Sequence, residues 1–474
     1  MDTQLVVLGG GPGGYAAAFL AADKGMDVTI VDIEQRLGGT CLLRGCIPSK
    51  ALLHVARVIA ESREVAEWGV DLGEACIDID IMRTRQEKVV QTLSGGLKHL
   101  AKRRKVKLIN ARGILVDSGT MELEGGDPAT FENRRITFEN CILATGSKPA
   151  LPQGFDLGTD RVMDSTGALA LPEIPDTLLV IGGGYIGLEL GTVYAELGSQ
   201  VTVVELTGNL LPGVDRDLVK PLHKRLEGLF DQIYLNTKVA SLKDQGRQIE
   251  ATLEGENANG PVSFDRVLVA IGREPCTSGI GIENTHAQLD ERGFVRVNAQ
   301  QRTSDPQIWA IGDVAGEPML AHKASHQGKV AVEALLGEPA EFDAVAIPAV
   351  VFTDPEIAWA GLTAEEAKQQ GREFEVAQYP WQASGRAHAI GRTDGLTKWI
   401  VDPSSQRVLG AGIVGTGAGE LIAEAVLALE MGSKARDVAH TIHPHPTMSE
   451  TTAFASEVFL GTATEIYRPK RTVD

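Results

Sequence analysis

The sequence has few cysteines, a deficit of positive charge and no long apolar run. Five cysteines among 474 residues do not make a disulfide scaffold, and their odd number excludes complete pairing within the chain. Lysine and arginine number 45 against 63 aspartates and glutamates, and the net charge of −18 argues against nucleic acid as a partner. No stretch approaches the length of a membrane-spanning helix. The length allows two to four domains with a large core.

We also expect no leader segment. The first glycine-rich turn begins at Gly9, which leaves no room for a signal or transit peptide before it. We therefore expect a cytoplasmic protein without a membrane span. The excess of negative charge suits solubility or a basic protein partner.

Two of the five cysteines stand close together, between Leu37 and Lys50. Four residues separate Cys41 from Cys46, a spacing that can close into a disulfide with Gly45 supplying the backbone freedom. The apolar run 51–59 predicts a helix just after Cys46, and a thiolate near a helix N-terminus is stabilised by the helix dipole. A reduced, buried pair is the alternative for an isolated C-x4-C. The nucleotide-binding turn that precedes the pair favours a redox dithiol beside a cofactor.

A glycine fingerprint occurs twice in the chain. Each copy follows an apolar strand and has the pattern G-x-G-x-x-G: Gly9, Gly11 and Gly14 in the first copy, Gly182, Gly184 and Gly187 in the second. Each is followed by a helical stretch, a β-branched strand and an acid, 18 residues past the third glycine. These acids are Asp32 and Glu205.

This pattern is typical of dinucleotide binding. The first glycine makes the turn, the second lets the backbone approach a pyrophosphate, and the third lets the helix pack on the strand. The helix N-terminus holds the phosphates and the acid accepts a hydrogen bond from a ribose hydroxyl. No arginine or lysine follows Glu205 within 206–215, so the second site favours NAD over NADP.

Further strand–glycine junctions divide the chain. Apolar strands end at Gly146 and Gly272, and a third ends at Asp313, whose carboxylate is suited to a cofactor's polyol chain. After about residue 347 shorter alternating strands predict an α+β domain. We expect an α/β protein with two Rossmann-like dinucleotide-binding domains and a C-terminal α+β domain. The predicted boundaries are 1–149, 150–272, 273–346 for a second part of the first domain, and 347–474.

Histidines mark a second chemical cluster, between His443 and Glu450. Prolines on both sides of His445 restrict its backbone, and Glu450 can accept a hydrogen bond from one ring nitrogen. That pairing is the base-and-orienter arrangement of acid–base catalysis. A metal site is not expected, because no third ligand stands at a recognisable spacing. A surface loop without function is the alternative.

With these motifs assembled, the chain resembles the pyridine nucleotide–disulfide oxidoreductases, and among them the dihydrolipoamide dehydrogenases. The resemblance covers nearly the whole length. The matching segments are Gly38–Lys50, Ala144–Gly146, Gly182–Glu189, Ala310–Asp313, Met319–Lys323, Pro380–Arg386 and His443–Glu450. The family binds FAD at the first fingerprint and NAD at the second, and it forms a homodimer through the last domain.

The resemblance implies roles for individual side chains. Cys41 would be the outer thiol that exchanges with substrate and Cys46 the inner thiol beside the flavin. His445 would be the base, delivered to the partner subunit's active site, with Glu450 as its orienter. Lys50 and Glu189 would form an ion pair near the flavin. The cofactor contacts would be Gly9, Gly11, Gly14, Asp32, Gly39, Thr40, Lys50, Thr145, Gly146, Asp313, Met319, Leu320, Ala321, His322, Gly182, Gly184, Tyr185, Gly187, Glu205 and Gly272.

The implied reaction is oxidation of protein-bound dihydrolipoamide to lipoamide with NAD⁺ as acceptor. The implied partners are lipoyl domains and the core acyltransferase of 2-oxo acid dehydrogenase complexes, or the lipoyl protein of glycine cleavage. Glutathione reductase is the nearest rival, because a tyrosine at the position of Tyr185 also occurs there; the missing arginine after Glu205 speaks against it. Mercuric reductase would need a terminal cysteine pair, which 461–474 lacks. A role chiefly as an assembly subunit is the alternative outside enzyme chemistry.

Overall fold

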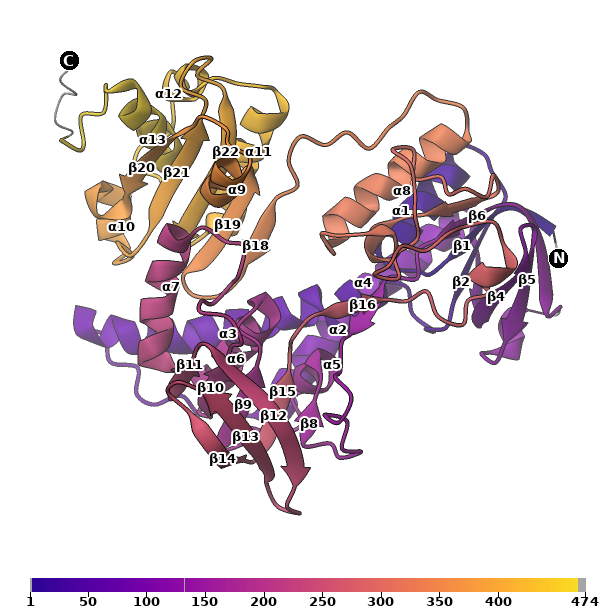
Figure 1. Cartoon of the computed structure of the whole chain (residues 1–474), viewed down its shortest axis with the longest axis horizontal. Helices are drawn as coiled ribbons and strands as arrows, with labels where there is room; N and C mark the ends of the chain where they lie inside the picture. The colour runs from indigo at the N-terminus through magenta and orange to yellow at the C-terminus, as the bar shows by residue number, and fades with distance from the viewer. Residues whose placement is uncertain (1, 132, 468–474) are drawn as a thin grey trace.

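The computed structural model describes residues 2–131 and 133–467. The outer ends of the first and last predicted domains, residue 1 and residues 468–474, lie outside the described residues. Three lobes surround a pair of long central helices (Figure 1). Each lobe is built on its own sheet.

The first lobe has a mostly parallel sheet in the order β3-β2-β1-β6-β5-β4, with β17 on the other side of β6. Parallel pairing of β1 with both β2 and β6 places the first glycine turn at the carboxyl edge of the sheet, where ligands bind in such folds. Helices α1 and α8 pack together on one face. The elements are β1 (Asp2–Leu8), α1 (Pro12–Asp23), β2 (Val28–Asp32), β3 (Lys107–Asn110), β4 (Arg112–Asp117), β5 (Thr120–Glu124), β6 (Arg135–Leu143), β17 (Ile308–Ala310) and α8 (Ala321–Leu335).

The second lobe repeats this plan in a parallel sheet of order β11-β10-β9-β15-β8. An antiparallel sheet, β12-β13-β14, extends beside it (Figure 1). The elements are β8 (Val162–Met163), α5 (Ser165–Leu169), β9 (Thr177–Ile181), α6 (Tyr185–Leu197), β10 (Gln200–Val204), α7 (Arg216–Leu229), β11 (Gln232–Tyr234), β12 (Thr237–Asp244), β13 (Ile249–Gly255), β14 (Asn259–Phe264) and β15 (Arg266–Val269). A two-stranded link, β7 (Ser147–Pro149) with β16 (Arg273–Pro275), joins the first two lobes.

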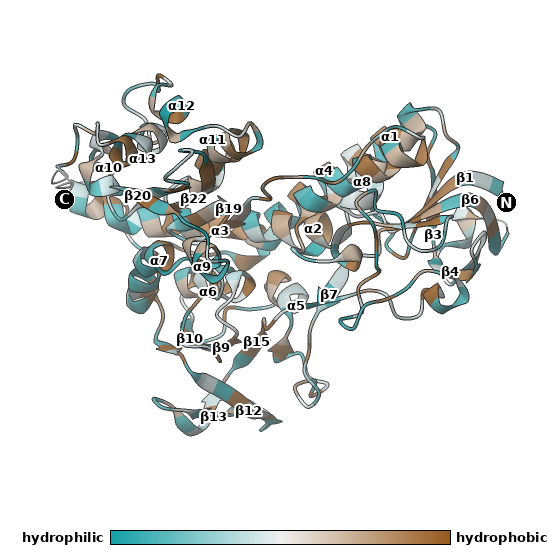
Figure 2. Ribbon diagram, turned by 45° about the horizontal axis from the view of Figure 1, so that its top comes forward, coloured by the Kyte–Doolittle hydropathy of each residue, from teal (hydrophilic) through white to brown (hydrophobic). Residues whose placement is uncertain are grey.

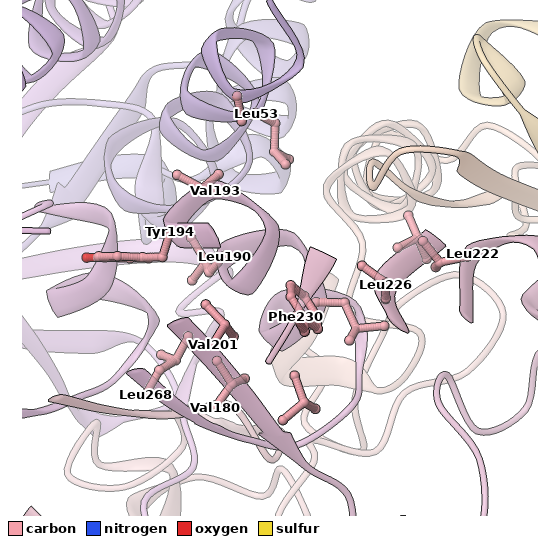
Figure 3. Close-up of a cluster of buried hydrophobic side chains, with 14 of the residues drawn as sticks. Leu53, Val180, Leu190, Val193, Tyr194, Val201, Leu222, Leu226, Phe230 and Leu268 are labelled. Carbon is pink, nitrogen blue, oxygen red and sulfur yellow. The ribbon is translucent and has the colours of Figure 1, made fainter. Parts of the chain in front are cut away.

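The central helices are α3 (Cys46–Glu64) and α4 (Ile79–Arg103), preceded by the short α2 (Gly39–Arg44). The predicted helix over 51–59 therefore begins earlier, at Cys46 itself. One face of α3 is buried against α6, and Figure 3 shows Leu53 of α3 facing Val193 of α6. This apolar contact fixes the dithiol helix against the second nucleotide-binding lobe.

The third lobe is an antiparallel sheet of order β18-β19-β22-β21-β20 covered by helices. Trp381 and Trp399 are fully buried in its core. The elements are β18 (Ala349–Val351), β19 (Glu356–Gly361), α9 (Ala364–Gln369), β20 (Glu375–Pro380), α10 (Gly385–Ala389), β21 (Leu396–Val401), β22 (Val408–Gly415), α11 (Ala418–Glu430), α12 (Ala435–Ala439) and α13 (Glu450–Leu460).

Hydropathy follows this layering. Apolar residues concentrate in the sheet strands, while the outer side of α7 is hydrophilic (Figure 2). Its inner side buries Leu218, Val219, Leu222 and Leu226. In the described part of the chain, no helix is both long and apolar enough to cross a membrane.

Candidate functional site

A cavity of about 540 Å³ opens between the first glycine turn, the cysteine loop and the start of α8. It brings together residues that are far apart in the sequence. The predicted site residues on its wall are Gly9, Gly11, Asp32, Gly39, Thr40, Cys41, Cys46, Lys50, Thr145, Gly146, Tyr185, Glu189, Asp313, Met319 and Ala321. A dithiol and a nucleotide-binding turn therefore share one cavity.

The cysteine loop is shaped by α2 and α3. Cys41 lies inside α2 and Cys46 is the first residue of α3; both are free thiols in this structure. Gly45 joins the two helices, and a Cβ at this position would lie 2.7 Å from the Thr40 carbonyl oxygen. A side chain at Gly45 would thus push the two cysteines apart, since real Cβ atoms do not approach so closely.

The two thiols differ in acidity. A hydrogen bond with the Cys41 thiol lowers the pKa of Cys46 to about 7, and the nearby Lys50 ammonium acts in the same direction against the opposing effect of burial. The same hydrogen bond and burial raise the pKa of Cys41. The N-terminus of α3 also favours a thiolate at its first residue. The hydrogen bond, the cation and the helix N-terminus all favour the thiolate at Cys46.

This acidity predicts a pH dependence for alkylation. In reduced protein, the rate at which iodoacetamide labels Cys46 should rise with pH and reach half its maximum near pH 7, because its thiolate forms as the pH passes its pKa. Lys50→Met should move the midpoint up by about one pH unit, because the stabilising cation is lost. Peptide mass spectrometry measures each site, with exposed Cys76 as the reference for reagent reactivity. A lower midpoint at Cys41 than at Cys46 would contradict the assignment.

Lys50 and Glu189 meet across the first two lobes. The Lys50 Nζ lies 2.8 Å from Glu189 Oε2, and the Glu189 side chain is almost completely buried. Phe352 supports both partners: its backbone N–H donates to Glu189 Oε1 at 2.9 Å, and its ring centroid lies 4.5 Å from Lys50 Nζ. The ammonium is therefore held at the cavity wall, near the cysteine that it helps to ionise.

The two glycine turns have matching hydrogen bonds. In the first, Gly10 N–H donates to Asp32 Oδ2 at 2.5 Å; in the second, Gly183 N–H donates to Glu205 Oε2 at 2.7 Å. The other carboxylate oxygens accept from the backbone of Glu34 and Thr207. Each oxygen keeps a further lone pair for a ribose hydroxyl.

Burial raises the pKa of Asp32, and the backbone N–H groups of Glu34 and Gly10 oppose that shift. The Asp32 carboxylate is thus held in place by backbone N–H groups, one of them in the first glycine turn. The surrounding backbone, rather than a side-chain cation, supplies its main hydrogen-bond donors.

The space around each glycine, probed by placing a Cβ atom on it, shows whether the two turns leave room for a dinucleotide. A Cβ on the third glycine, Gly14 or Gly187, would overlap a carbonyl oxygen of its own turn, so those glycines serve helix–strand packing. A Cβ on Gly184 would meet nothing within 4 Å, and one on Gly11 would touch only Gly39 Cα, at 3.7 Å. The protein leaves open space at the second glycine of each turn. That is the space a pyrophosphate needs, so the residues fit FAD at the first turn and NAD at the second.

The open space at Gly184 and the crowding at Gly187 lead to a mutational prediction. Gly184→Ala should leave the melting temperature unchanged, because the added methyl has room in the free protein. It should raise KM for NAD⁺, because the methyl takes space that a pyrophosphate needs; overpacking of about 1–3 kcal/mol corresponds to roughly 5- to 150-fold. Steady-state kinetics and calorimetry measure the two effects. Gly187→Ala is the contrasting variant and should lower the melting temperature.

Asp313 is held by residues of the β7–β16 link between the first two lobes. Ser147 Oγ–H donates to Asp313 Oδ2 at 2.5 Å, and Arg273 donates to both the Ser147 hydroxyl at 2.8 Å and its carbonyl at 2.7 Å. Sequence reasoning missed Ser147 and Arg273, although both flank predicted strand–glycine junctions. They fix the carboxylate predicted to contact the cofactor's polyol chain.

Some of the remaining predicted cofactor contacts line the cavity and others do not. Tyr185, Met319 and Ala321 line the cavity, whereas Leu320 and His322 are not part of its wall. His322 instead hydrogen-bonds the Pro348 carbonyl oxygen at 2.8 Å. The second-turn residues Gly182, Gly184, Gly187, Glu205 and Gly272 also lie outside this cavity, as does buried Gly14. Cys276, which carried no signal in the sequence, lies on its wall.

His445 and Glu450 form the predicted pair. His445 Nδ1 lies 2.9 Å from Glu450 Oε1, and the other carboxylate oxygen accepts from Thr447 N–H at 2.8 Å. The pair does not line the cavity, and the His445 side chain is 78% exposed. Its second nitrogen, Nε2, is therefore available to another molecule.

In the part of the chain that the structure describes, no group of three or more histidine, cysteine, aspartate or glutamate side chains is arranged to hold a metal ion. The histidines have other partners. His443 pairs with Glu424 at 2.6 Å and His445 with Glu450.

Comparison with family models gives two matches that together cover most of the chain. Residues 3–328 match the pyridine nucleotide-disulphide oxidoreductase family, and residues 347–455 match the dimerisation domain of the same family. Among relatives, a dihydrolipoyl dehydrogenase of Vibrio cholerae is 47% identical over 99% of this chain and 98% of its own length. One of Geobacillus stearothermophilus is 41% identical over 98% of each chain.

Solved structures resemble the whole chain. LpdA of Mycobacterium tuberculosis superposes with a TM-score of 0.88 at 27% identity, covering 96% of this chain and 99% of its own. The HOCl-induced flavoprotein disulfide reductase RclA of Escherichia coli gives a TM-score of 0.84 at 28% identity, with 96% and 99% coverage. The three-lobed arrangement is thus common to these proteins.

Proposed function

The chain belongs to the pyridine nucleotide–disulphide oxidoreductase family, and on that basis we propose that it oxidises dihydrolipoyl groups with NAD⁺ as the electron acceptor. It is a homodimeric enzyme whose cofactors are FAD and NAD. The observation that carries the proposal is the single cavity in which an acidic Cys46, its partner Cys41 and the first glycine turn come together. The relatives of the same length are named for this reaction.

The first step is proton removal from the substrate. In the oxidised enzyme, with Cys41 and Cys46 joined, Nε2 of His445 of the partner subunit takes a proton from one thiol of dihydrolipoamide. Glu450 accepts the hydrogen bond from Nδ1, which leaves Nε2 as the basic nitrogen. The exposure of His445 in its own chain suits delivery across a dimer interface.

Thiol–disulfide exchange follows. The substrate thiolate forms a bond to Cys41 Sγ, the Cys41–Cys46 bond breaks, and its electron pair stays on Cys46 as thiolate. The second substrate thiol then attacks the mixed disulfide at the substrate sulfur, and its proton passes to Cys41 as the bond between Cys41 and the substrate breaks. Lipoamide leaves as a cyclic disulfide, the electron pair returns to Cys41, and the histidine keeps the first proton, so Cys46 remains a thiolate. The substrate has lost two electrons and the enzyme disulfide has gained them.

The depressed pKa of Cys46 favours this exchange, because a thiol that ionises near pH 7 is a good leaving group. Lys50, held by Glu189 and Phe352, keeps a positive charge beside it. The first glycine turn, Asp32 and Asp313 would hold FAD, which when bound would supply the electron transfer between the dithiol and NAD⁺. Glu205 would accept a hydrogen bond from the ribose of NAD⁺ and repel a 2′-phosphate.

Steady-state NADH formation from dihydrolipoamide tests the proposal. NAD⁺ should support turnover, and NADP⁺ should give a kcat/KM lower by about 10²-fold or more, because a carboxylate faces the extra phosphate. Glutathione disulfide with NADPH is the competing pair. Faster turnover of that pair would refute the proposal.

The wider setting belongs to the same proposal. The substrate arm would be a lipoyl domain bound to the core acyltransferase of a 2-oxo acid dehydrogenase complex, or the lipoyl protein of glycine cleavage. The acidic surface, with a net charge of −18, suits a basic binding segment of such a core. A cytoplasmic location fits the low cysteine content, five in 474 residues, which does not make a disulfide scaffold.

A further inference from the structure

We infer that His443 is a positioning residue for His445, and that it acts by fixing the histidine loop to α11 through Glu424. The inference rests on the proposed function, in which His445 is the base. It assigns different tasks to two histidines that stand two residues apart.

Burial separates the two side chains. The His443 side chain is 7% exposed, whereas that of His445 is 78% exposed. A buried ring cannot reach a substrate thiol on another molecule, but it can hold the backbone on which the exposed ring is mounted. The pattern of burial therefore makes His445 the reacting side chain and His443 its anchor.

Both ring nitrogens of His443 are engaged. Nε2 lies 2.6 Å from Glu424 Oε1, and Nδ1 lies 2.8 Å from the Thr441 carbonyl oxygen. Two hydrogen bonds on opposite sides of a ring fix both its position and its rotation. The loop is thereby joined to α11, an element on the main sheet of the third lobe.

Glu424 extends this connection to α13. Its second oxygen, Oε2, accepts from Thr452 Oγ1 at 3.0 Å, and the same hydroxyl lies 3.3 Å from His443 Nε2. Thr452 is fully buried and stands two residues after Glu450. Glu424 therefore holds both the segment before His445 and the helix that carries its orienter. Figure 1 shows α11 and α13 together in the third lobe.

The catalytic pair itself is bonded mainly within the loop. Glu450 accepts from His445 and from Thr447 N–H, and Thr447 Oγ1 donates to the Pro444 carbonyl oxygen at 2.7 Å. These contacts fix His445 relative to Glu450. They do not fix this unit relative to α11, which is what the His443–Glu424 pair does. A base displaced by about 1 Å can lose about 10²-fold in rate, so this anchor matters to the reaction.

The test uses the holoenzyme dimer with His443→Gln and, as a second variant, Glu424→Gln. We expect kcat for dihydrolipoamide oxidation to fall about 10- to 100-fold in each. NADH–dye reduction, which needs no base at the dithiol, should be unchanged, and so should KM for NAD⁺. The matched control is Glu420→Gln, the same chemical change at an exposed position of α11, and it should retain full activity.

The split between the dithiol and dye assays is the readout that a merely structural role would not produce, and the double variant tests whether the two residues are coupled. Its loss in dithiol kcat should equal that of the worse single variant, because the two residues act as one unit. Unchanged dithiol kcat in both single variants would overturn the inference. Equal losses in the dithiol and dye assays, together with a lowered melting temperature, would overturn it as well. His445→Gln is measured in parallel: if it keeps full dithiol activity, His445 is not the base and the positioning role falls with it, whereas failure of the unmodified enzyme to oxidise dihydrolipoamide with NAD⁺ would refute the proposed function itself.

Discussion

A Cys41→Ser variant is expected to lose NAD⁺-dependent oxidation of dihydrolipoamide by at least about 10⁴-fold, the scale of losing a covalent nucleophile. A hydroxyl cannot form the disulfide with Cys46 or the mixed disulfide with substrate. Flavin binding should persist, because the glycine turn and Asp32 that fit FAD are not altered. Steady-state NADH formation and the flavin absorbance of the purified protein measure these two properties.

Cys276→Ser is the matched control for this experiment. Cys276 lies on the wall of the same cavity, but the cysteine hydrogen-bonded to Cys41 is Cys46. The control should therefore keep nearly full activity. Equal losses in the two variants would show that a cavity thiol in general, and not the Cys41–Cys46 pair, is needed.

Replacing His445 with glutamine should lower dihydrolipoamide oxidation by about 10²- to 10⁴-fold, the usual contribution of a general base. Glutamine can keep a hydrogen bond to Glu450 but cannot accept a proton from a substrate thiol. NADH–dye reduction should remain close to that of the unmodified enzyme, because that reaction involves no dihydrolipoamide. Stopped-flow and steady-state assays separate the two halves of the reaction.

His440→Gln is the control, since His440 is an exposed histidine in the same part of the third lobe. It should behave as the unmodified enzyme in both assays. If His445→Gln lowers dye reduction as much as dithiol oxidation, the base assignment is wrong.

Local patterns predicted the nucleotide-binding lobes well. Each G-x-G-x-x-G lies between a strand and a helix, and each acid ends or follows the next strand, as the spacing indicated. This information is local because a turn, a helix start and a strand use neighbouring residues. The family comparison confirms the α/β fold with a dimerisation domain.

The dithiol helix was predicted from the apolar run 51–59, just after Cys46. In the structure this helix, α3, starts at Cys46 itself and includes Pro48 in its first turn. Proline is tolerated there, because the N–H groups of a first turn have no partner within the helix. The correction matters, since it places the helix N-terminus at the sulfur that ionises.

The Lys50–Glu189 pair was predicted from the family resemblance, but other contacts between distant segments gave no signal in the sequence. Arg273 reaches Ser147 across 126 positions, and Phe352 reaches Glu189 across 163. None of these four residues lies in a sequence motif that identifies the residue it contacts here. Even the His443–Glu424 pair, 19 positions apart, depends on how α11 packs beside the histidine loop.

By itself the sequence determined the chemistry available to this protein: a C-x4-C dithiol, two phosphate-binding turns, an acid for each ribose and a histidine with its carboxylate. These follow from residue type and short spacing. The tertiary structure alone decided which distant residues support these groups: Ser147 and Arg273 at Asp313, Phe352 at Glu189, and Glu424 at the buried His443. These supports depend on how segments far apart in the sequence pack together, which residue type and short spacing do not determine.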